Sequence, residues 1–178
     1  MGSDESLFEA AREVAMAGLR AAVRRVDAAV EIGVEGDRDH ELDRAVTEAL
    51  WWVKSLEDLW EEESGEAFYR ARDASADGIA IGGLAYARNV GGHRVDRTYD
   101  EVVYRAASAL ESVVIASFGE RWPPLSHLPA LPMEDPFGRA EMYSRHVADR
   151  PLLEPFRAAL AFFEDLLEDE LDSVDARL

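Results

Sequence analysis

The placement of proline constrains this chain more than any other feature of its sequence. All seven prolines lie at or after Pro123, so the whole segment before that residue contains none. Proline lacks a backbone N–H, and its ring clashes with the preceding turn, which excludes it from helix interiors. A proline-free segment of this length is typical of long helices, and we expect an all-α fold.

Two apolar stripes predict the first two helices. In residues 3–32 and again in residues 39–64, apolar side chains recur every three or four positions. This spacing gathers them on one face of a helix. Trp51 and Trp52 widen the second stripe, which predicts that this helix lies centrally or at an interface.

A third helical pattern covers residues 66–89 and leads into Gly91 and Gly92. We expect this helix to stop near Asn89. Glycine in a helix interior costs about 1 kcal/mol relative to alanine. The small residues inside this pattern therefore predict close packing against a neighbouring helix: Gly78, Gly82 and Gly83.

The second half of the chain has a less regular pattern. Residues 98–118 fit a helix, which we favour for their first half. The β-branched run in the second half fits a strand equally well, which leaves a small β-hairpin near 102–122 open. We expect a proline-rich loop over 119–136 that packs on the body of the protein. C-terminal helices are expected within 139–175. Together these elements predict an up-and-down helical bundle, a single domain over residues 1–178.

The composition limits where we expect the protein to reside and which chemistry its side chains can perform. The net charge of −18 favours solubility and repels nucleic acids and anionic membranes, although residues 70–97, which hold the candidate motif below, contain five arginines against three aspartates. The absence of cysteine excludes disulfides and thiolate chemistry, and we expect no metal and no cofactor. No stretch of 18 uncharged residues is present, so we expect no membrane span. The acidic N-terminus differs from a secretion signal, and a cytoplasmic location is expected.

The candidate site is the run Arg88-Asn89-Val90-Gly91-Gly92-His93 at the end of the third helical pattern. The run contains an arginine, whose guanidinium suits phosphate, an asparagine with its side-chain amide, and a histidine, which titrates near neutral pH. Asn89 is the only asparagine in the chain. Two other arginine–histidine pairs have a similar spacing, and we expect ordinary loop or packing contacts for them: Arg121 with His127, and Arg139 with His146.

The run resembles the Arg-x(4–6)-His motif of HEPN-domain proteins, which are small all-α bundles. The motif and its helical setting cover roughly residues 40–100. Many HEPN proteins are metal-independent ribonucleases of toxin–antitoxin and phage-defence systems, and the resemblance implies a homodimer that pairs two motifs in one cleft. HEPN toxins modified by a nucleotidyltransferase carry a tyrosine two residues after the histidine. Val95 stands there, so this modification is not expected.

The residue types of the run fit metal-independent RNA cleavage. His93 would take the proton of the ribose 2′-hydroxyl, because its pKa lies near neutrality. The guanidinium of Arg88 would stabilise charge on the phosphorane. Asn89 would orient the histidine or donate to a phosphate oxygen. RNA would be the substrate, and an antitoxin or another protein is a possible partner.

Two further hypotheses remain open at this stage. The chain could be a HEPN-like interaction module without catalysis, which binds a partner through the face of Trp51 and Trp52 or through the cleft at Arg88. It could also be an acidic protein that mimics nucleic acid. The proline-rich C-terminal part, in which Trp122-Pro123-Pro124 is the densest motif, is similar to uncharacterised proteins of high-GC bacteria and adds no activity.

Overall fold

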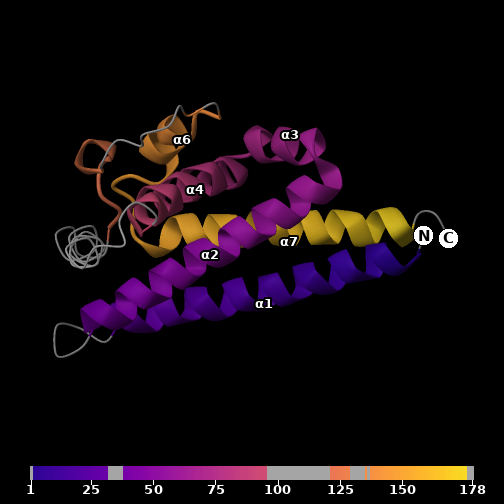
Figure 1. Ribbon diagram of the computed structural model, residues 1–178, viewed down its shortest axis with the longest axis horizontal. Coiled ribbons are helices and arrows are strands. Elements are labelled where there is room, and N and C mark those ends of the chain that lie inside the picture. Colours follow the sequence, from indigo (N-terminus) through magenta and orange to yellow (C-terminus); the bar gives the residue numbers. More distant parts are fainter. Residues whose placement is uncertain (1, 32–37, 96–120, 129–134, 136, 176–178) are drawn as a thin grey trace.

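The computed structural model describes residues 2–31, 38–95, 121–128, 135 and 137–175, and these form an all-α bundle (Figure 1). The described part holds six α-helices and one short 3-10 helix, with no strand. This confirms the all-α fold expected from the proline-free segment. The described ranges hold no helix that combines the length and the apolar character needed to cross a bilayer.

Helices α1 (Gly2–Glu31) and α2 (Arg38–Ser64) form a long antiparallel hairpin, and α7 (Leu153–Asp175) lies alongside α1 (Figure 1). Their apolar stripes are buried as the periodicity predicts, with Leu19, Val26, Leu56 and Phe156 all fully buried. Ion pairs between these helices add to the apolar packing: Arg12 with Glu63, Arg25 with Glu48, Arg20 with Glu164, and Arg157 with Asp27.

The third helical pattern is two helices rather than one. Helix α3 (Glu66–Ala74) ends before Ser75, whose extended backbone separates it from α4 (Ala76–Val95). The Ser75 hydroxyl accepts a hydrogen bond of 2.9 Å from the backbone N–H of Gly78. A side-chain oxygen in this position satisfies one of the free N–H groups of the new helix, which is how an N-cap starts a helix.

Helix α4 lies in the middle of the bundle, packed against α2, α6 (Arg139–His146) and α7 (Figure 1). A methyl group added at Gly83 would lie 2.6 Å from Val147 Cγ2 and 3.0 Å from the Cα of Tyr143. A methyl group at Gly82 would overlap Met142. The close helix packing predicted from these small residues is therefore confirmed.

The predicted end of this helix is wrong. The helix does not stop near Asn89 but continues through Gly91 and Gly92 to Val95. Each glycine weakens the helix by about 1 kcal/mol, and the packing of α4 between its neighbours outweighs that cost.

The described part of the proline-rich loop packs on the body of the protein, as expected. Trp122 is buried, and its indole Nε1 donates a hydrogen bond of 3.0 Å to the carbonyl of Leu152. The loop continues into the 3-10 helix Leu125–His127. The possible hairpin near 102–122 falls almost entirely outside the described residues, and Arg121 forms an isolated antiparallel bridge with Pro151 instead.

Candidate functional site

Helix α4 carries all three residues of the arginine–histidine motif. Successive positions of an α-helix are about 100° apart around its axis. Asn89 and His93 therefore lie one turn apart on the same side of α4, because they are separated by four residues. Arg88 and His93 are five residues apart, which places their positions about 140° apart around the axis. Positions 88 and 93 thus lie on different sides of a single α4.

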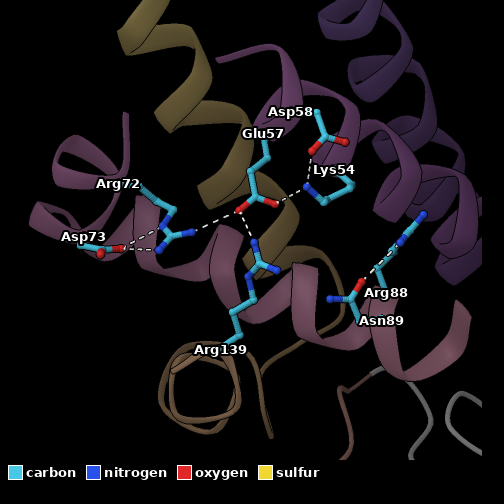
Figure 2. Close-up of polar contacts among 8 residues, drawn as sticks. All are labelled: Lys54, Glu57, Asp58, Arg72, Asp73, Arg88, Asn89 and Arg139. Atoms are coloured by element: carbon cyan, nitrogen blue, oxygen red, sulfur yellow. Dashed lines mark hydrogen bonds and ion pairs between the residues drawn. The ribbon is translucent and has the colours of Figure 1, made fainter. Parts of the chain in front are cut away.

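Arg88 and Asn89 contact each other directly (Figure 2). The guanidinium Nη1 of Arg88 donates a hydrogen bond of 3.3 Å to the side-chain oxygen of Asn89. The same guanidinium lies over the ring of Trp51 on α2, at 4.8 Å from the ring centre. The ring and the amide hold the cation in place while it stays partly exposed.

The two adjacent tryptophans of α2 have different environments. The ring of Trp52 packs against Gly18 of α1, where even a methyl group would overlap it. Trp51 is 57% exposed. The expected aromatic face of Trp51 and Trp52 is therefore divided, and Trp51 alone faces solvent beside Arg88.

The charge environment of Arg88 differs from that of most arginines in this acidic chain. No carboxylate contacts Arg88 within the described ranges. Most other described arginines form ion pairs with acidic side chains, as Arg20 does with Glu164 and Arg157 does with Asp27. A partly exposed guanidinium can donate two parallel hydrogen bonds to an anionic group such as phosphate.

The arginines of the two other arginine–histidine pairs make structural contacts. Arg121 Nη1 donates a hydrogen bond of 2.7 Å to the carbonyl of Asp149, which ties the loop to the end of α6. Arg139 Nη2 donates a hydrogen bond of 3.0 Å to the carboxylate of Glu57.

A second polar cluster surrounds Glu57, which is fully buried on α2 (Figure 2). Three cations contact its carboxylate. Arg72 of α3 lies at 3.1 Å, Arg139 of α6 at 3.0 Å and Lys54 at 3.2 Å. Asp73 forms an ion pair with Arg72, and Asp58 forms one with Lys54. The cluster links α2, α3 and α6 through a single buried carboxylate.

Aromatic rings extend this cluster toward the surface. Tyr69 stacks on Phe137 with ring centres 5.8 Å apart, Arg72 lies over the ring of Tyr69, and Arg139 lies over the ring of Phe137. Burial and a hydrogen bond to Glu61 raise the pKa of Tyr69 far above its usual value. This phenol therefore stays neutral and cannot act as a general base near neutral pH. Tyr69 also lines a shallow, open pocket together with Glu66 and Asp73.

The sequence pattern did not reveal the Glu57 cluster. One signal was present, because Glu57 stands inside the apolar stripe of α2 between Val53 and Trp60. Its two arginine partners lie 15 and 82 residues away, so helical spacing could not identify them. Each charged side chain of this cluster has an oppositely charged protein partner, although Arg139 Nε and Glu57 Oε2 form no hydrogen bond among the described residues. We interpret the cluster as structural.

Comparisons of the chain with protein-family models, with curated proteins and with solved structures found no match.

Proposed function

We propose that the chain is a HEPN-type metal-independent endoribonuclease, with a composite site formed by Arg88, Asn89 and His93 of two protomers. The observation that carries this proposal is the Arg88–Asn89 pair. It presents a guanidinium without a carboxylate partner among the described residues, on the helix that carries the histidine. The type of reaction and its independence from metal are inferred from the resemblance to the HEPN motif.

The proposed reaction uses each residue type for one task. His93 takes the proton of a ribose 2′-hydroxyl, and the 2′-oxygen attacks the adjacent phosphorus. The bond from phosphorus to the 5′-oxygen then breaks, and that oxygen leaves and takes up a proton from water. Arg88 stabilises the extra negative charge on the phosphorane, because its planar guanidinium can donate two parallel hydrogen bonds to phosphate oxygens. Asn89 orients the guanidinium through their hydrogen bond of 3.3 Å.

The geometry of α4 supports a dimeric site. The positions of Arg88 and His93 diverge by about 140° around one helix, so a single α4 is poorly arranged to place both on one phosphate. A two-fold symmetric dimer presents the same surface twice. Such a dimer can place Arg88 of one protomer opposite the partner's His93. We therefore propose a cytoplasmic homodimer that acts as a toxin or defence effector, restrained by an antitoxin or another protein.

The test is a cleavage assay with purified protein and single-stranded RNA in excess EDTA. Wild type should cut the RNA, and Arg88→Ala and His93→Ala should each lower the rate about 100-fold or more, as expected for loss of a charge stabiliser or a general base. Arg24→Ala is the matched control, because Arg24 is exposed on α1 away from the motif. Equal activity of all four proteins, or none in wild type, refutes the proposal.

A non-catalytic HEPN-like interaction module is the second candidate, and the exposure of Trp51 favours it. A large exposed aromatic ring next to a cation is typical of the central residues of protein interfaces. This candidate predicts that wild type leaves RNA intact in the same assay. It also predicts that Trp51→Ala abolishes the binding of a protein partner.

A further inference from the structure

Trp51 differs from the three other tryptophans of the chain. Trp60 and Trp122 are buried, and Trp52 packs against α1, whereas Trp51 is 57% exposed. Leaving an aromatic ring in water gives up the free energy that its burial would provide. Its exposure leaves the ring accessible to a ligand.

The surroundings of Trp51 suit a ligand that is both aromatic and anionic. Arg88 lies over the ring at 4.8 Å from the ring centre, and more than half of the Trp51 residue surface is still accessible with the guanidinium in place. Asn89 also holds the guanidinium, because its side-chain oxygen accepts the hydrogen bond from Nη1. An exposed ring can stack on a planar base, while a partly exposed guanidinium bonds a phosphate.

We propose that Trp51 is a stacking platform for an unpaired base of single-stranded RNA, with Arg88 bonding the phosphate next to that base. This inference rests on the proposed function for the identity of the nucleic acid. Bases within a duplex are stacked on each other and cannot reach a ring on the protein surface, so the platform selects single strands. Stacking also tolerates every base, because each base has an aromatic face.

The position of Trp51 gives it a role in binding rather than in the reaction. It belongs to α2, whereas Arg88, Asn89 and His93 belong to α4. Trp51 thus fixes where the strand lies relative to Arg88. Because the same ring holds Arg88, its loss should raise KM for RNA and also lower kcat. Trp51→Phe, which keeps a ring beside the guanidinium, should restore both.

The test is direct binding of a fluorescently labelled 2′-O-methyl oligonucleotide of about ten nucleotides, measured by anisotropy. This probe lacks the nucleophilic hydroxyl and stays intact. Wild type should bind the single strand more tightly than the same sequence in a duplex. Trp51→Ala should weaken single-strand binding about 5- to 150-fold, and Trp51→Phe should restore most of it. Phe137→Ala is the matched control, because Phe137 is also an exposed aromatic residue and should leave binding unchanged.

The outcomes separate this inference from the proposed function. Single-strand binding that depends on Trp51, together with no cleavage of ordinary RNA, supports the platform and refutes the nuclease. Equal binding by wild type and Trp51→Ala refutes the platform, even where wild type cuts RNA. Absence of binding by wild type overturns the platform. Circular dichroism spectra of the variants show whether a loss of binding comes from a loss of folding.

Discussion

Replacing Glu57 by glutamine should destabilise the protein strongly, although it changes only one atom of a side chain. Glutamine keeps the volume and one acceptor oxygen but removes the charge. Arg72, whose side chain is 1% exposed, then keeps only Asp73 as a carboxylate partner, and Arg139 loses the one carboxylate that contacts it among the described residues. Removing one partner of a buried ion pair costs about 3–5 kcal/mol, because the remaining charge stays buried without compensation.

The size of the effect follows from the protein's length. A change of 1 kcal/mol moves the melting temperature of a domain of this size by roughly 2–4 °C. Glu57→Gln should therefore lower the melting temperature by about 6–20 °C. Urea unfolding followed by circular dichroism gives the corresponding free energy. The control is Asp58→Asn, which removes the other, exposed carboxylate that pairs with Lys54 and should cost less than about 1 kcal/mol.

A double variant separates charge compensation from simple loss of contacts. Glu57→Leu combined with Arg72→Met replaces a buried ion pair by apolar side chains of similar volume, which is often neutral. The double variant should therefore be more stable than Glu57→Leu alone. If the two single losses simply add up in the double variant, or if Glu57→Gln costs less than about 1 kcal/mol, the interpretation of Glu57 as the centre of a compensated ion cluster is refuted.

Three further predictions concern the contacts of α6. Gly83→Ala should destabilise the protein by about 1–3 kcal/mol in urea unfolding, because the new methyl group would lie 3.0 Å from the Cα of Tyr143 and push α6 away from α4. Tyr143→Phe should cost about 1–3 kcal/mol in the same assay, since it leaves the buried carbonyl of Pro123 without its hydrogen bond of 2.7 Å. Burial, with a smaller effect of Asp149, raises the pKa of Tyr143 above 10.0 in the folded protein. The stability from its neutral phenol is therefore fully present below about pH 10 and is lost as the pH rises further, a decline that should be smaller in Tyr143→Phe.

Local patterns in the sequence predicted most of the bundle. The apolar periodicity of α1 and α2 placed Leu19, Val26 and Leu56 in the core, where the structure has them. Glycines inside α4 predicted its close contact with another helix. These features could be predicted because burial of one helix face depends only on residues three and four positions apart.

The features that the sequence pattern missed depend on tertiary packing. The break at Ser75 has a local signal, an N-cap serine followed by Asp77 in the first turn, but the apolar pattern continues across it. The continuation of α4 through Gly91 and Gly92 depends on helices that pack on it, which no propensity records.

The candidate site shows the same division between local and distant contacts. Sequence spacing identified Arg88 and Asn89, which contact each other. The stacking of Arg88 on Trp51 joins residues that are 37 positions apart in the chain. Such a contact exists only once α2 and α4 are packed together, so helical spacing could not predict it.

In the proposed composite site, Arg88 of one protomer works with His93 of the other, and two-fold symmetry gives each dimer two such pairs. Coexpression of Arg88→Ala and His93→Ala chains tests this arrangement most directly. A mixed dimer then holds one pair with both residues intact and one pair with neither. Each variant alone should be inactive in the EDTA cleavage assay. The coexpressed mixture should recover about one quarter of the wild-type activity, because about half of randomly paired dimers are mixed and each of these keeps one of its two pairs. A mixture as inactive as the two single variants would contradict it.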